Sequence, residues 1–296
     1  MYPAVIETYD APTSVQEALQ TLSERGNESY FLAGGQSLMQ ALKSRVISPK
    51  GLIDLQRVAE LNGIEYNRGA VRIGSMTRYR DIATEERLDG AYQALRDAAS
   101  HVGDRQVRNR GTIGGSLCWN YIAACMPPTC IGLGASLDLV SKGGKRSLLA
   151  EEFLQSPLET ARRDDEIVVA VTLPAPPKLC GSAYKKWGLV TDALPVVGVC
   201  AFIAISDDGR CHLARLAVGG VATGPRRAMA GEKALIGVSA TDVSAISDAA
   251  EAAAASTETQ SDMWADAEYR KKLIGTLACE VITTAFVRSA RRNIGE

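Results

Sequence analysis

Two loops in the sequence combine paired glycines with hydroxyl side chains, a composition suited to binding anions. They are residues 34–37 (GGQS) and residues 112–116 (TIGGS). Because glycine has no side chain, backbone N–H groups can approach a phosphate closely there, and serine and threonine hydroxyls add donors. Two such loops could hold the two halves of a pyrophosphate. Each could equally be an ordinary tight turn, since paired glycines commonly mark turns.

The common phosphate-binding fingerprints are absent from the sequence. Neither loop matches the G-x-G-x-x-G pattern of dinucleotide-binding Rossmann folds. The pattern G-x-x-x-x-G-K-[ST], typical of nucleoside triphosphatases, does not occur either. The glycine loops therefore do not indicate a Rossmann or a P-loop protein.

The cysteines and histidines offer neither a metal centre nor a catalytic triad. The spacing of Cys118, Cys125 and Cys130 fits neither zinc knuckles nor iron–sulfur motifs, so we expect small buried hydrophobic residues there. His101 and His212 lie in separate halves of the chain, and neither has a companion histidine at metal-ligand spacing. We predict no metal ligands and no catalytic side chain, and we expect a bound cofactor to supply any chemistry.

The composition indicates a globular protein that does not bind nucleic acid and does not span a membrane. The chain has 296 residues, of which 46% are hydrophobic, and its formal net charge of −1 offers no basic field to a phosphate backbone. The longest apolar run, residues 194–205, is too short to span a bilayer. The first residues lack a secretory signal and the cysteines are odd in number, so we expect reduced thiols in the cytoplasm.

Helix and strand patterns surround the glycine loops in the first part of the chain. Ser14 and Glu17 form a capping box for a predicted helix over residues 14–25. A buried strand over residues 29–33 leads into the first loop, and a helix follows from residue 38 until Pro49 stops it. The remaining predictions are strands over residues 52–55, 71–73, 136–140, 145–149 and 166–173, and a helix over residues 90–101.

A proline-rich linker at residues 174–177 (PAPP) divides the chain into predicted domains of residues 1–176 and 177–296. Beyond the linker, two long strands over residues 195–206 and 210–218 flank a turn sequence, Asp-Asp-Gly. Two helices follow, over residues 242–255 and 269–292, and the second has a basic end that suits the helix dipole. We predict an α+β fold whose second domain is a small antiparallel sheet with helices on one face.

Several segments resemble, in the same order, the FAD-binding subunit of molybdenum hydroxylases. This family includes the medium chains of carbon monoxide dehydrogenase and the flavin domain of xanthine dehydrogenase. The resemblance covers nearly the whole chain. The matching segments are residues 31–38 (FLAGGQSL), 52–55, 107–117 (VRNRGTIGGSL), 166–168, 182–186, 219–227 and 266–270.

The resemblance implies both a fold and a division of labour between subunits. Residues 1–176 would form an FAD-binding domain of the PCMH (vanillyl-alcohol-oxidase-like) type, and residues 177–296 a domain like the C-terminal domain of carbon monoxide dehydrogenase flavoproteins. Electrons would pass from [2Fe–2S] clusters in a small subunit through FAD to an external acceptor. The substrate would be oxidised at molybdopterin in a large subunit of a heterotrimer, or of its dimer. The alternative is an FAD-free scaffold subunit of the same kind of complex.

The resemblance also implies a set of cofactor-binding residues. The two loops would bind the pyrophosphate and ribityl region through backbone amides, and Val168 and a lysine would lie near the flavin or its adenine. Lys185 is the predicted lysine, with Lys186 as the alternative. The complete set is Leu32, Ala33, Gly34, Gly35, Gln36, Ser37, Leu38, Thr112, Ile113, Gly114, Gly115, Ser116, Tyr121, Val168 and Lys185.

The sequence departs from the family in two places. Residues 120–125 (NYIAAC) stand where the family commonly has Ala-Asp-Pro-x-x-Asp, so both aspartates that help to hold the cofactor are missing. Near Asp192, Val190 and Leu194 replace the usual arginine and aromatic residue. We expect Tyr121 to stack on the cofactor or to hydrogen-bond it instead. The missing aspartates are what motivates the scaffold alternative.

Overall fold

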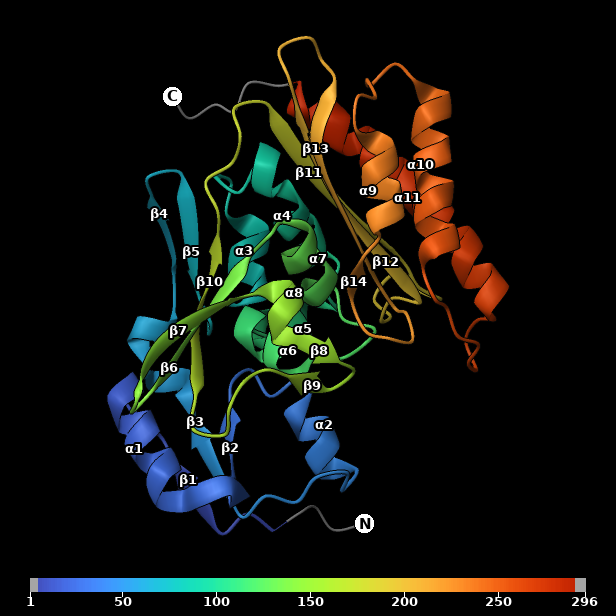
Figure 1. Cartoon of the computed structure of the whole chain (residues 1–296). Coiled ribbons are helices and arrows are strands. Elements are labelled where there is room, and N and C mark those ends of the chain that lie inside the picture. Colours follow the sequence, from blue (N-terminus) through green and yellow to red (C-terminus); the bar gives the residue numbers. More distant parts are fainter. Residues whose placement is uncertain (1–4, 291–296) are drawn as a thin grey trace.

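A computed structural model describes residues 5–290 and arranges most of them in four layers (Figure 1). From left to right in this view, the layers are a five-stranded sheet, a group of short helices, a four-stranded sheet and a group of C-terminal helices. A three-stranded sheet continues the molecule at the bottom of the view. None of the helices formed by residues 5–290 is long and apolar enough to cross a membrane.

The three-stranded sheet carries the first glycine loop. Its parallel strands lie in the order β1 (Thr8–Asp10), β3 (Gly51–Asp54) and β2 (Ser29–Leu32). Helix α1 (Val15–Arg25) packs beside β3, and the hydroxyl of Ser14 accepts a hydrogen bond from the Glu17 N–H, which confirms one half of the predicted capping box. The other half is wrong, because the Glu17 carboxylate accepts from the Thr13 N–H and not from the Ser14 N–H. Residues 33–37 then connect β2 to α2 (Leu38–Lys43). Short 3₁₀ helices occupy Gly26–Glu28, Leu55–Arg57 and Ala59–Leu61.

The five-stranded sheet is antiparallel and has a late strand at its centre. The order is β4 (Ile64–Asn67), β5 (Ala70–Gly74), β10 (Ile167–Leu173), β6 (Ser136–Ser141) and β7 (Gly144–Leu149). Strand β10 is buried on both faces: Val171 belongs to the core beneath the short helices, and Val169 to the core beneath α1. A two-stranded hairpin, β8 (Leu154–Ser156) and β9 (Glu159–Thr160), contacts the helical layer described next.

The helical layer includes an unexpected helix at the second glycine loop. Its members are α3 (Tyr79–Thr84), a 3₁₀ turn at Gly90–Tyr92, α4 (Gln93–Ser100), α5 (Arg105–Arg110), α6 (Ile113–Trp119), α7 (Met126–Gly132) and α8 (Ala150–Phe153). Thr112 caps α6, and its hydroxyl accepts a hydrogen bond from the Gly115 N–H at 3.2 Å. The prediction of a loop over residues 112–116 is therefore wrong, because the threonine cap starts a helix within it.

The C-terminal part forms the four-stranded antiparallel sheet, β11 (Cys180–Trp187), β12 (Val197–Ile205), β13 (Cys211–Gly219) and β14 (Arg226–Arg227). Helices α9 (Met229–Leu235), α10 (Val243–Ser256) and α11 (Ala267–Ser289) cover one face, which confirms the predicted arrangement. Helices α4 and α7 pack on the other face. Side chains of β12 alternate between the two sides, so Ala201 joins the core under α10 and α11 while Phe202 joins the core under α4 and α7.

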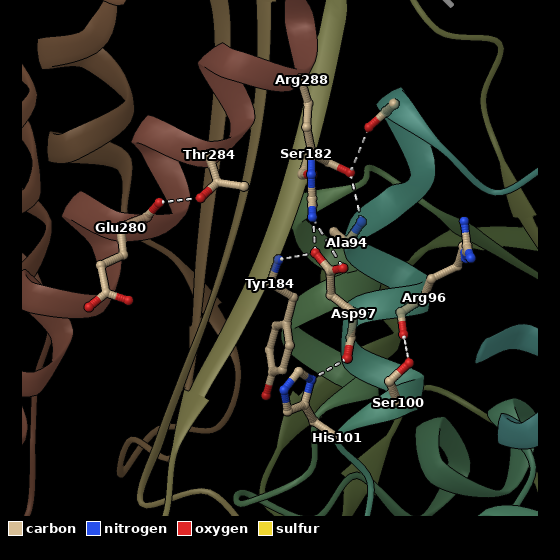
Figure 2. A network of polar contacts seen from close by, with 11 residues as sticks. Ala94, Arg96, Asp97, Ser100, His101, Ser182, Tyr184, Glu280, Thr284 and Arg288 are labelled. Atoms are coloured by element: carbon tan, nitrogen blue, oxygen red, sulfur yellow. Dashed lines mark hydrogen bonds and ion pairs between the residues drawn. The ribbon is translucent and has the colours of Figure 1, made fainter. Parts of the chain in front are cut away.

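A polar network fastens the helical layer to the four-stranded sheet (Figure 2). The Asp97 carboxylate on α4 accepts hydrogen bonds from Arg288 Nη1 on α11 at 2.6 Å and from the Tyr184 N–H on β11 at 3.3 Å. The Ala94 N–H donates to the Ser182 hydroxyl at 2.9 Å. His101 Nδ1 bonds the Asp97 carbonyl at 2.6 Å, which agrees with a structural role for this histidine. These contacts fix the position of β11 beside the cavity described below.

Two further expectations concern the thiols and the last helix. All seven cysteines lie within the described residues, none of them is in a disulfide bond, and five are buried. The predicted helix over residues 269–292 corresponds to α11, which begins two residues earlier and ends at Ser289. The basic end predicted at Arg291 and Arg292 lies outside the described residues.

Candidate cofactor site

A cavity of about 420 Å³ lies between the three-stranded sheet, helix α6 and the connection from β11 to β12. Cavities of this size commonly hold small molecules and cofactors. Four of the predicted site residues, Leu32, Gly35, Ile113 and Lys185, do not line its wall. The others do, and they are Ala33, Gly34, Gln36, Ser37, Leu38, Thr112, Gly114, Gly115, Ser116, Tyr121 and Val168.

The first glycine loop brings unpaired backbone donors to this cavity. Within residues 5–290, the N–H groups of residues 34–38 have no hydrogen-bond acceptor in the protein. Gly35 adopts a left-handed conformation, with φ of 73°, and turns the chain from β2 toward α2. Successive free amides around a left-handed turn form a concavity suited to an anion. This loop therefore fits the phosphates of the FAD that the resemblance implies.

The second glycine loop differs, because its amides are already used inside the protein. The Ile113 N–H donates to the Thr77 carbonyl at 3.1 Å, and the Gly114 N–H to the Ser75 carbonyl at 2.8 Å. The Gly115 and Ser116 N–H groups both bond Thr112, at its hydroxyl and its carbonyl. Each backbone amide of residues 113–116 is therefore already paired within the described part of the chain, and the binding of a pyrophosphate by this segment stays a prediction. This segment forms part of the cavity wall through the first turn of α6.

The glycines of both loops are required by contacts between chain segments. A Cβ on Gly34 would lie 2.1 Å from the carbonyl oxygen of Arg110, and one on Gly114 would lie 2.7 Å from that of Ser75. Real Cβ atoms do not approach backbone oxygens so closely, so any side chain would push the segments apart. From the sequence, the reason for these glycines is the close approach of the backbone to a phosphate. The structure adds a second reason, because glycine also lets the two loops pack together as one wall of the cavity.

The structure places Lys186, the alternative lysine, on the cavity wall and Lys185 outside it. Lys185 is exposed, and its ammonium group pairs with Glu280 on α11, away from the cavity. Lys186 lines the cavity and donates from Nζ to the Ala193 carbonyl at 2.5 Å. The physical reason is the alternation of β11, which directs neighbouring side chains to opposite faces of the sheet. Burial lowers the pKa of the Lys186 amine below its usual value.

The segment that lacks the family aspartates also contributes to the wall. Tyr121 is 40% exposed and lines the cavity, as does the buried Cys125, whose thiol pKa is raised by burial. Asn120 does not line it, and its side-chain amide instead donates to the carbonyls of Ser156 and Glu159. Residues 120–125 therefore offer an aromatic ring and a thiol where carboxylates were expected.

Glu166 is a wall residue that the sequence did not single out. Its carboxylate is almost fully buried and accepts hydrogen bonds from Arg146 Nε at 2.6 Å, Arg146 Nη2 at 2.7 Å and the Arg163 N–H at 2.7 Å. Burial alone raises the pKa of this carboxyl, but these partners outweigh burial and hold it below its usual value. The carboxylate is therefore fully committed to protein donors and supports the wall.

Wall residues from several other elements were not among the predicted cofactor-binding residues. They include an aromatic residue of α3, apolar residues before and within α5, and apolar residues just before β12. These residues are Tyr79, Val102, Val107, Leu194 and Pro195. Their apolar side chains suit the flat, largely apolar ring system of a flavin.

Comparisons with known families match nearly the whole chain. Residues 5–176 match the family described as the FAD binding domain in molybdopterin dehydrogenase. Residues 182–285 match the C-terminal domain of carbon monoxide dehydrogenase flavoprotein. Within the described residues these segments contain the walls of the cavity on both sides.

Individual relatives are similar over their full length. The chain is 32% identical to the carbon monoxide dehydrogenase medium chain of Hydrogenophaga pseudoflava over 282 residues, which cover 95% of this chain and 98% of that one. It is 35% identical to the glyceraldehyde dehydrogenase medium chain of Sulfolobus acidocaldarius, covering 94% and 97%. A xanthine dehydrogenase FAD-binding subunit of Escherichia coli O157:H7 is 27% identical, covering 94% and 95%.

Solved structures agree with this assignment. Carbon monoxide dehydrogenase from Hydrogenophaga pseudoflava superimposes with a TM-score of 0.91 at 33% identity, covering 97% of this chain and 99% of that one. Quinoline 2-oxidoreductase from Pseudomonas putida 86 gives the same TM-score at 30% identity, covering 98% and 100%. The unpaired backbone amides of residues 34–38 fit the phosphates of FAD. The chain therefore belongs to the family of FAD-binding medium subunits of molybdenum hydroxylase-type dehydrogenases.

Proposed function

We propose that this chain receives electrons from the [2Fe–2S] clusters of a small partner subunit and passes them, through FAD in the cavity, to an external acceptor. A large partner subunit with molybdopterin would oxidise the substrate, and the three would form a heterotrimer or its dimer. Several relatives are named medium chains or FAD subunits, which supports this division. The observation that carries the proposal is the row of unpaired amides at residues 34–38, all of which except Gly35 line the cavity wall.

We propose that the first glycine loop holds the phosphates of FAD. The N–H groups of residues 34–38 donate to the phosphate oxygens, and the ammonium group of Lys186 adds a positive charge inside the cavity. Thr112, Gly114, Gly115 and Ser116 continue the same wall through the first turn of α6. In this proposal Lys186 takes the place of Lys185.

The other wall residues exclude water and orient the ring system. Val168, Leu194 and Pro195 give the cavity apolar surface, and Tyr121 supplies an aromatic ring that can stack on the cofactor. Bound FAD supplies redox chemistry that couples one-electron iron–sulfur clusters to one- or two-electron acceptors. Neither His101 nor His212 lines the cavity, so the role of the chain in this proposal is to bind and orient the cofactor.

The second candidate is an FAD-free scaffold subunit of the same kind of complex. It is favoured by the absence of a carboxylate from residues 120–125, where the family commonly has two. The unpaired amides of residues 34–38 oppose it, because free backbone donors beside a cavity are costly unless an anion or water satisfies them. We therefore favour the FAD-carrying subunit.

Two further parts of the proposal concern organisation and compartment. We propose that the chain divides into domains of residues 1–176 and 177–296 at the proline-rich linker, which lies between β10 and β11. We propose the cytoplasm as the compartment, because seven cysteines outside any disulfide bond suit a reducing environment.

The test is to mix the FAD-loaded chain anaerobically with the small subunit after its clusters have been reduced and excess reductant removed. The proposal predicts that the visible flavin bands bleach as the clusters are reoxidised. A stable complex in which the flavin stays oxidised would contradict the electron route. A chain that joins its partners but takes up no FAD would establish the scaffold alternative.

A further inference from the structure

The connection between β11 and β12 forms one side of the cavity. Ala193, Leu194 and Pro195 line the wall, next to Lys186 at the end of β11. Lys186 Nζ donates to the Ala193 carbonyl at 2.5 Å, so the lysine and the connection hold each other in place. The conformation of residues 188–196 therefore determines the position of the cationic and apolar groups on this wall.

The first turn of α11 contacts both ends of this connection. The Tyr269 ring packs edge-on against Trp187, the last residue of β11, with 5.5 Å between centroids and an interplanar angle of 86°. The next residue, Arg270, donates from Nη1 to the carbonyl of Val196 at 2.5 Å, immediately before β12. The Val196 N–H donates to the Trp187 carbonyl at 2.8 Å, so the two contacts fall on the paired base of the connection.

Arg270 also reaches the wall segment that lacks the family aspartates. The same Nη1 donates to the carbonyl of Gly220 at 3.0 Å, and the Gly220 N–H donates to the Ile122 carbonyl at 2.8 Å. Ile122 directly follows the wall residue Tyr121. A Cβ on Gly220 would lie 2.2 Å from the Val196 carbonyl oxygen, so the two segments touch at this guanidinium.

The surroundings of Arg270 suit a guanidinium and no other side chain. The residue is 3% exposed, and Nη2 pairs with the Asp262 carboxylate at 2.5 Å, while Nε has no partner within the described part of the chain. Burying this charge is costly, and two carbonyls and one carboxylate offset the cost. Lysine would keep the charge but lacks the planar set of donors that reaches all three groups.

We propose that Tyr269 and Arg270 are positioning residues for the FAD site. They fix the base of the 188–196 connection and, through Gly220, the adjoining segment at Tyr121, so that the two wall segments are ordered before the cofactor enters. A preformed wall lowers the entropy cost of binding. The inference rests on FAD binding in the cavity and not on the electron route proposed above.

The test uses the full chain as the variants Tyr269→Ala and Arg270→Lys, stripped of FAD and titrated with FAD by fluorescence. Each variant is expected to raise the Kd of FAD by about tenfold, the change that 1.4 kcal/mol produces. The exchange of backbone amide hydrogens is expected to accelerate within residues 188–196, and much less within α9 and α10, which lie in the same layer as α11. The control is Lys272→Ala, an exposed residue of the same helix, which should change neither quantity.

A double-mutant cycle distinguishes positioning from general stability. Trp187→Ala and Tyr269→Ala should each weaken FAD binding, and the double variant should lose little more, because both remove the same contact. Unchanged FAD affinity and unchanged exchange in folded Tyr269→Ala and Arg270→Lys chains would overturn the proposal. If Arg270→Lys does not fold, Tyr269→Ala decides alone, since its ring is 40% exposed. Failure of the electron route would leave these titrations unaffected.

Discussion

Gly34 and the carbonyl oxygen of Arg110 approach so closely that a Cβ on Gly34 would lie 2.1 Å from that oxygen. Arg110 ends α5, and only Gly111 and Thr112 separate it from the start of α6. The contact therefore brings the first glycine loop, with its free amides, against the start of the second. The two loops act as one wall because glycine permits this approach.

Replacement of Gly34 by alanine tests this contact. Backbone atoms cannot rotate aside as side chains do, so we expect Gly34→Ala to lower the free energy of unfolding by about 1–3 kcal/mol. The measurement is urea denaturation of the FAD-free chain. The matched control is Gly143→Ala, in the turn between β6 and β7, where the new Cβ would lie an ordinary 3.6 Å from Ser141 Oγ. Equal stability of the two variants would argue against the contact.

Gly35 offers a test of the anion-binding turn. Gly35 and Gly26 both have positive φ angles, 73° and 69°, so alanine strains the backbone at each site. Only Gly35 belongs to the loop with free amides. We expect Gly35→Ala to raise the Kd of FAD several-fold and Gly26→Ala to leave it unchanged, as measured by fluorescence titration. Similar affinities in both variants would sink the assignment of the phosphates to this loop.

The two lysines should behave differently toward FAD. Lys186→Gln removes a cation from the cavity and is expected to weaken FAD binding, whereas Lys185→Gln removes only the exposed pair with Glu280. Because burial lowers the pKa of the Lys186 amine, the ammonium group loses its proton at a lower pH than that of an ordinary lysine does. FAD affinity should therefore decline with rising pH in the native chain, and that decline should be smaller in Lys186→Gln. Titrations across the alkaline range check both statements.

The buried pair between Arg146 and Glu166 predicts a pH dependence of stability. The pKa of the Glu166 carboxyl is lowered in the folded chain. The stability that the ionised carboxylate adds is therefore fully present above the ordinary pKa of 4.5, and it is lost as pH falls through the lowered pKa. Glu166→Gln should cost about 1–3 kcal/mol at neutral pH and make the acid loss of stability less steep. Denaturation curves at several pH values measure this. Asp10→Asn, which breaks the exposed pair with Arg25, should have little effect, and an equal effect would contradict the account.

Local signals in the sequence were sufficient for several elements. The Ser14 cap, the Asp-Asp-Gly turn before β13 and the apolar run of β12 each depend on neighbouring residues, and each is present in the structure. Gly209 in that turn has φ of 80°, the conformation that glycine supplies. Short-range stereochemistry therefore accounts for these predictions.

Contacts between distant residues account for what the sequence did not predict. The amides of residues 113 and 114 are taken by Thr77 and Ser75, and no spacing rule reveals a partner so far along the chain. The central place of β10 in its sheet likewise depends on pairing with residues 70–74. Lys185 and Lys186 could not be assigned to faces because both sides of β11 are covered, by α11 on one side and α4 on the other.

The most direct measurement is hydrogen exchange of the backbone amides of the full chain with and without FAD. The account predicts that FAD slows exchange at residues 34–38, whose amides are free without it, and changes little at residues 113–116, whose amides are already bonded. Protection at residues 113–116 with none at residues 34–38 would contradict it, and so would saturating FAD that protects neither segment.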